Sequence, residues 1–151
     1  IPIEFKYTEP IVPTKLQKVL YGEVLEKYLR EEIIISNLSS KIENAPDFYI
    51  IDDARNFCLR NNVKEKVIMI KTTQLKPVKD IENNYKFIKD TEAILQVEED
   101  SPPLRLIISE EMIAEKDEIA KKVVEAAKDM GLTEPLIRIE EALKLVCRKE
   151  L

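Results

Sequence analysis

Two short runs of β-branched and aromatic residues, separated by a segment of helical length, constrain this fold more than any other feature. Phe48-Tyr49-Ile50-Ile51 and Val67-Ile68-Met69-Ile70 each have the length and composition of one buried strand. The segment between them predicts one helix, with Asp52 as its N-cap. Because parallel strands need a long crossover connection, this order predicts a parallel βαβ unit.

Other apolar runs extend the predicted sheet. Ile33–Ile35 is typical of a buried strand, and Ile3–Tyr7 of an edge strand. Residues 94–97 and 104–108 predict two more strands, joined as a hairpin by a short acidic and proline-containing connection. Residues 77–88 are ambiguous, and we expect a helix there.

Three helices are expected outside the βαβ unit. The first begins after a capping box formed by Thr14 and Gln17 and continues past Gly22, where close packing of another element would explain the glycine. The second is predicted to begin after Ser109 and to end near Met130, with Gly131 as a left-handed cap. The third begins at Thr133 and buries its apolar side chains, at positions 136, 139, 143 and 146, in the core.

These elements place the chain in the α/β class, with a mixed, partly parallel sheet of about five strands, flanking helices and a helix-rich C-terminus. The length of 151 residues fits one domain, 1–151, preceded over about residues 1–13 by a proline-rich arm. No apolar run approaches the roughly 20 residues needed to cross a bilayer, so we expect no membrane partner.

The absence of histidine and the scarcity of glycine exclude several kinds of site. Without histidine, the chain lacks the commonest general base and metal ligand, so the usual Ser and Cys triads cannot form. With only two glycines, Gly22 and Gly131, it has no P-loop and no dinucleotide-binding loop. We therefore predict no cofactor and no catalytic residue of a familiar kind.

Asp52 and Asp53 form the clearest candidate site, because they directly follow a predicted buried strand. Two carboxylates at that edge of an α/β sheet could bind Mg²⁺. The alternative is that Asp52 caps the following helix and Asp53 complements its dipole. A nuclease-like site would need a carboxylate where the chain has Met69, two residues before Lys71. Only a degenerate nuclease-like domain, or another metal-dependent phosphoester enzyme, fits that pattern.

Charge is distributed unevenly along the chain, which carries a net charge of −5. Residues 53–89 hold nine basic and four acidic side chains, whereas residues 90–118 hold two basic and ten acidic ones. The basic part, 64–89, interleaves lysines with aromatic residues, a pattern that can contact phosphates and stack on bases. Its candidate nucleic-acid or partner-binding residues are Lys71, Lys76, Lys79, Tyr85, Lys86, Phe87 and Lys89. The alternative is a solvated face that forms ion pairs with the acidic segment.

Cys58 and Cys147 lie far apart and form no metal-binding or redox motif, so we expect two buried thiols that act as small hydrophobes, with a disulfide as the lesser alternative. Abundant lysine, glutamate and isoleucine with little glutamine are typical of a thermophile. Together these features predict a cytoplasmic protein.

The sequence favours a non-catalytic interaction domain or accessory subunit of a thermophile complex. The proline-rich arm and the amphipathic last helix are the expected docking elements, and the expected partner is another protein or a second copy of the chain. A nucleic-acid-associated accessory protein that uses residues 64–89 is the second hypothesis. A metal-dependent phosphoester enzyme centred on Asp52 and Asp53 is the third.

Overall fold

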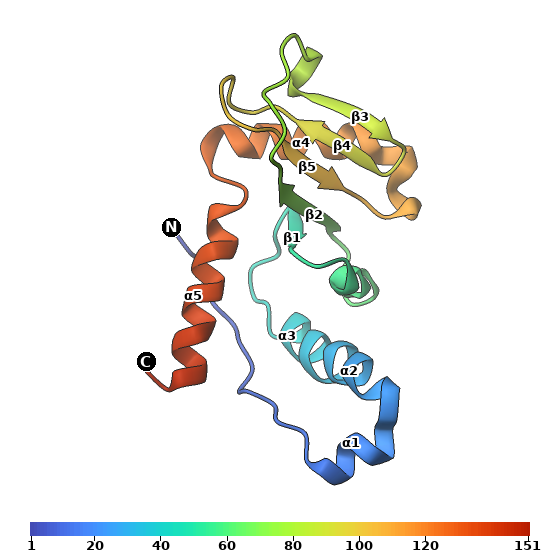
Figure 1. Ribbon diagram of the computed structural model, residues 1–151, viewed down its shortest axis with the longest axis vertical. Helices are drawn as coiled ribbons and strands as arrows, with labels where there is room; N and C mark the ends of the chain where they lie inside the picture. The colour runs from blue at the N-terminus through green and yellow to red at the C-terminus, as the bar shows by residue number, and fades with distance from the viewer.

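A computed structural model describes residues 1–151, and its centre is a mixed five-stranded sheet (Figure 1). The strand order is β1-β2-β5-β4-β3; β1 and β2 are parallel, and every other neighbouring pair is antiparallel. The strands span Phe48–Ile51 (β1), Lys66–Thr72 (β2), Tyr85–Lys89 (β3), Glu92–Leu95 (β4) and Leu104–Ile107 (β5). The predicted α/β class with a partly parallel sheet and a helix-rich C-terminus is confirmed.

Helical segments precede, connect and follow the strands. Before the sheet lie α1 (Lys15–Tyr21), η1 (Gly22–Val24), α2 (Leu25–Tyr28), η2 (Leu29–Ile35) and α3 (Ser36–Ser40). The connections contain η3 (Ala54–Asn61) and η4 (Glu82–Asn84), and the chain ends with η5 (Glu110–Glu115), α4 (Lys116–Asp129) and α5 (Glu134–Arg148). Figure 1 shows α4 beside the sheet, whereas α1 lies at the opposite end of the molecule.

One face of the sheet packs against α4 and forms the larger core. Ile68 and Ile70 of β2 and Leu106 of β5 are almost fully buried there, together with Val123 of α4. The amphipathic pattern of α4 explains this contact, because its four buried residues, Ile119, Ala120, Val123 and Val124, recur at helical spacing.

The opposite face is covered by η3 only over β1 and β2. Ile51, Val67 and Met69 are buried there against Phe57 and Leu59 of η3. Farther across this face, Arg105 forms an ion pair with Glu92 at 2.5 Å. Consecutive residues of β2 are therefore buried on both faces, as its unbroken apolar run predicts.

Buried Gln96 joins the β2–β3 connection to the β4–β5 connection. Its side-chain oxygen accepts a hydrogen bond from the Val78 amide at 2.8 Å, and its Nε2 donates to the carbonyls of Glu98 and Ser101. All of its polar atoms thus have partners, as a buried amide requires.

Three expected elements are wrong. Ile33–Ile35 is not a strand but the end of the helical segment η2, because a short apolar run fits a helix face as well as a strand. Residues 3–7 form no strand. Residues 77–88 form no long helix: they contain an extended segment, the short η4 and most of β3. The antiparallel β4–β5 pairing is confirmed, although β4 begins two residues earlier than expected.

The starts of α1 and α5 were predicted correctly, but the roles of the two glycines were not. The capping box of Thr14 and Gln17 is present, and α5 begins directly after Thr133. Gly22, however, ends α1 with a φ of 56°, and a Cβ atom at this position would have no neighbour within 4 Å. The role of Gly22 is therefore left-handed backbone and not close packing. Gly131 lacks the expected left-handed conformation.

Every helix is too short or too polar to traverse a lipid bilayer.

Leu106→Ala is expected to lower the free energy of unfolding by about 2–5 kcal/mol, because it leaves a cavity at a fully buried central-strand position. Urea denaturation followed by circular dichroism measures this change. The control is Leu75→Ala, since Leu75 is half exposed and its truncation leaves no buried cavity. Equal losses in the two variants would contradict the assigned core.

Candidate functional site

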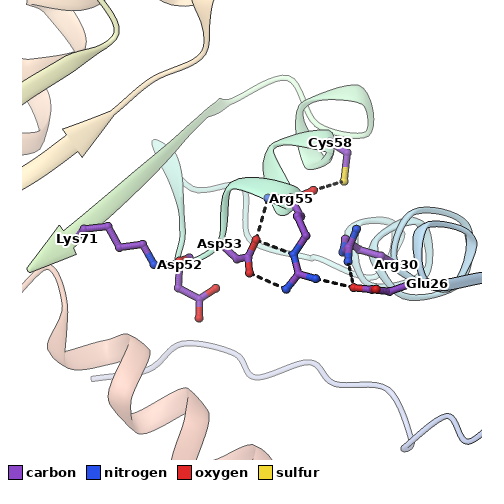
Figure 2. Close-up of polar contacts among 7 residues, drawn as sticks. All are labelled: Glu26, Arg30, Asp52, Asp53, Arg55, Cys58 and Lys71. Atoms are coloured by element: carbon purple, nitrogen blue, oxygen red, sulfur yellow. Dashed lines mark hydrogen bonds and ion pairs between the residues drawn. The ribbon is translucent and has the colours of Figure 1, made fainter. Parts of the chain in front are cut away.

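The two adjacent aspartates at the end of β1 point in different directions (Figure 2). Asp53, and not Asp52, is the N-cap of the following helix: its side chain accepts a hydrogen bond from the Arg55 amide at 2.9 Å. The expectation that Asp52 is the cap is therefore wrong. The backbone carbonyl of Asp52 accepts a hydrogen bond from Lys71 Nζ, while its carboxylate points away from Asp53.

A chain of ion pairs continues from Asp53 to the helical segment before the sheet. The Arg55 guanidinium donates to both oxygens of Asp53, at 3.0 and 2.8 Å, and to Glu26 at 2.5 Å. Glu26 also accepts from Arg30 at 2.6 Å (Figure 2). The Arg55 side-chain hydrogen bonds hold the pKa of Asp53 well below its usual range. The network links η3 to α2 and η2, although exposed pairs of this kind add little stability individually.

These contacts do not form a metal site from the two aspartates. Asp53 already has a cationic partner on both oxygens, and Arg55 would repel a divalent cation. No group of three or more His, Cys, Asp or Glu side chains is arranged to hold a metal ion. The geometry favours the capping alternative for the pair, with Asp53 in the capping role.

The five candidate lysines of the predicted basic segment are all exposed but lie on different elements. Lys71 lies near the end of β2 beside Asp52, and Lys76 and Lys79 lie in the extended connection that follows. Lys86 and Lys89 belong to β3 at the far edge of the sheet. The five cations are therefore spread over the end of β2, a connection and the edge strand β3.

The two aromatic residues between these lysines point toward α4. Phe87 packs on the larger core with Lys116 Nζ at 4.9 Å from its ring centroid, and the Tyr85 hydroxyl donates to Asp117 at 3.0 Å. Burial is the main cause of the raised pKa of Tyr85. Side chains alternate along a strand, so Lys86 points to the opposite face. The structure does not bring these rings and lysines together as one stacking surface.

The most unusual surface is the apolar face of α1. Leu16, Val19 and Leu20 follow helical spacing, yet their exposed fractions are 66%, 79% and 71%. Val24 in η1, beyond the break at Gly22, is also 61% exposed. No residue from Lys15 to Ser40 is buried. An amphipathic helix normally gains stability by covering its apolar face, and α1 covers none of it.

The last helix, α5, also leaves part of its apolar face exposed, although less of it than α1. Its expected core face is only partly covered: Val146 is buried, whereas Ile139 and Leu143 are about two-fifths exposed. Ile137 lies outside this stripe and is 62% exposed. The expectation that α5 contributes its whole apolar face to the core is therefore wrong.

The total surface area confirms that much of the chain lacks a packing partner. A folded monomer of this mass exposes about 7,900 Å², whereas this 17.5 kDa chain exposes 10,836 Å². Only 19 of its 151 residues are buried. The surplus of roughly 2,900 Å² shows that the chain is less compact than a monomer of this mass. The expectation that both thiols are buried is wrong, since Cys147 is exposed and Cys58 is only partly buried.

Two apolar grooves lie beside α5 and beside the α2–α3 helical segment. The first, of about 850 Å³, is lined by residues of the N-terminal arm, α3, β1 and α5; we call it the arm groove. The second, of about 580 Å³, lies between the α2–α3 helical segment and the β1–η3 unit. The free edge of β1 borders both grooves, since Tyr49 lines each of them. Neither groove is filled by the chain itself.

The arm and α5 were the expected docking elements, whereas α1 was not among them. The spacing of Leu16, Leu20 and Val24 is the same whether a core or a partner covers the helix. Gly22 carried a usable signal, because a glycine that ends the helix after two turns separates α1 from the segment that reaches the sheet.

Comparison of the chain with family models, with curated proteins and with solved structures gives no match in any of the three.

The Asp53 carboxyl group is expected to titrate below its usual range, because the hydrogen bonds from Arg55 favour the ionised form. The contact therefore stabilises the fold above the pKa that Asp53 has in the unfolded chain, and this contribution is lost as the pH falls through the lower folded-state pKa. Carboxyl-carbon NMR measures the titration. In Arg55→Ala the midpoint should move up toward the usual value, and an unchanged midpoint would contradict the contact.

Millimolar Mg²⁺ or Mn²⁺ is expected to leave the melting temperature unchanged, because Arg55 occupies both oxygens of Asp53. A thermal-denaturation series with and without metal tests this. A rise that disappears in Asp52→Asn and Asp53→Asn would instead establish a metal site at the end of β1.

Proposed function

We propose that this chain is a non-catalytic interaction protein, an accessory subunit that docks to protein through the apolar faces of α1 and α5. The exposed face of α1 carries the proposal, because it presents Leu16, Val19 and Leu20 to solvent without any covering element. Interfaces of permanent complexes resemble a domain core cut in half and are rich in such side chains. The lysine- and glutamate-rich composition supports a place for the complex in the cytoplasm of a thermophile.

Docking through α1 also accounts for the arrangement of the sheet and its helices. The β-sheet and α4 provide a rigid core, and the Asp53–Arg55–Glu26 network connects this core to the helical segment that follows α1. A partner bound to α1 would therefore be held to the core through α2 and η2. The polar side of α5 carries ion pairs such as Lys144–Glu140, which keep that side solvated.

Affinity purification of the tagged chain from its native host tests the proposal. The chain is expected in a stoichiometric complex, and amide hydrogen exchange of residues 15–21 should be slower in that complex than in the free chain. Leu143→Glu should weaken the complex, because it places a charge in the apolar stripe of α5.

The matched control is Arg148→Gln, which makes the same change in net charge on the opposite side of α5 and should leave the complex intact. Recovery of the wild-type chain alone, as a 17.5 kDa monomer with unprotected residues 15–21, would overturn the proposal.

A further inference from the structure

We propose that the partner is a second copy of this chain, and that α1 of each copy inserts into the arm groove of the other in a two-fold symmetric dimer. This inference rests on the proposed function and specifies its partner. It follows from three observations: an uncovered apolar helix, an unfilled apolar groove on the same chain, and the size of the surface surplus.

The helix and the groove have matching chemistry. α1 presents a single apolar stripe, formed by Leu16, Val19 and Leu20. The arm groove is lined largely by apolar side chains, including Phe5, Leu38, Ile50 and Ile139. Insertion of an amphipathic helix into such a groove is a recurring mode of protein recognition.

The charged residues of the groove do not oppose an apolar occupant. Lys6 pairs with Glu43 at 3.0 Å, and Arg138 pairs with Glu134 at 2.6 Å. Glu4 accepts a hydrogen bond from Asn44 at 2.7 Å, and this bond is the main cause of its lowered pKa. Each charge near the groove thus keeps a partner within its own chain when an apolar helix enters, which avoids the cost of burying an unpaired charge.

In a two-fold symmetric dimer, one arrangement covers both the apolar face of α1 and the arm groove. In an isologous dimer, every contact occurs twice, so each copy donates one helix and accepts one. In Figure 1, α1 lies below α2, at the end of the molecule opposite the sheet, and none of its residues lines the arm groove, so a copy does not fill its own groove in this conformation. A different protein would have to supply both a helix and a groove to cover the same surfaces.

The area requirement of a stable dimer is also met. If each copy covered only half of its surplus, the dimer would bury about 2,900 Å² in total, within the range of obligate homodimers. A net charge of −5 per chain is small enough that repulsion between copies would not offset apolar burial of this size.

Sedimentation of the purified chain over a wide concentration range provides the first test. The wild-type chain is expected at twice its 17.5 kDa mass. Leu16→Glu/Leu20→Glu should shift the monomer–dimer midpoint by about 100-fold or more toward the monomer. The control, Lys18→Glu, lies on the opposite side of α1 and makes the same change in net charge, so it should remain a dimer. All three side chains are exposed in one copy, so these variants retain the fold.

A mixing experiment tests the reciprocal contact. Ile139→Arg blocks the groove but keeps a normal α1, so this variant alone is also expected to be a monomer. When it is mixed with Leu16→Glu/Leu20→Glu, one intact helix meets one intact groove, and a heterodimer should form. Failure of the mixture to associate would overturn helix-in-groove docking.

The outcome also separates this inference from the proposed function. A wild-type chain that stays monomeric when pure, but occurs in a stoichiometric complex with another protein in its host, overturns the second-copy partner and leaves the proposed function standing. A monomer in both experiments overturns both.

Discussion

The fold depends on the need to cover both faces of β2. Val67, Ile68, Met69 and Ile70 are consecutive, so their side chains alternate between the two faces and each face must be shielded from water. The helix α4 shields one face and η3 shields the other, and both lie on chain segments adjacent in sequence to a strand of the sheet. Burial of β2 thus determines where β1, β5 and the two covering helices lie. The residues before β1 and after α4 lie at the margin of this core.

The elements around β2 could be predicted from the sequence, whereas the packing of the residues before β1 and after α4 could not. Consecutive apolar residues at 48–51 and 67–70 leave little choice between strand and helix when a helix-sized, capped segment separates them. Ile33–Ile35 lacks such a context, and three β-branched residues can end a helix as readily as they form a strand. The hairpin of β3 and β4 was also missed, because its two-residue connection, Asp90-Thr91, lacks the glycine typical of tight turns.

The candidate sites show the same limit at the level of single side chains. Adjacent aspartates after a strand were identified correctly as a feature, but the choice between Asp52 and Asp53 as cap depends on one backbone conformation that spacing alone does not give. Tyr85 and Phe87 lie among lysines in the sequence, yet strand alternation separates them from Lys86 in space, which could be deduced only after residues 85–89 were known to form a strand. The apolar spacing of α1 is the same as that of a core helix. Its exposure could therefore be recognised only from the three-dimensional structure around it.

The position of β5 at the centre of the sheet has a consequence for how the protein is made. During synthesis β1 and β2 emerge first and β3 and β4 follow, but the two pairs are not hydrogen-bonded to each other, because β2 and β4 pair with opposite edges of β5. Until residue 107 has left the ribosome, the nascent chain holds two separate half-sheets, and the larger core is incomplete until α4 follows. The sheet is therefore completed when a late strand enters between two earlier ones, and this contact between distant parts of the chain slows folding. Throughout this time the apolar helix α1, made long before, is already outside the ribosome.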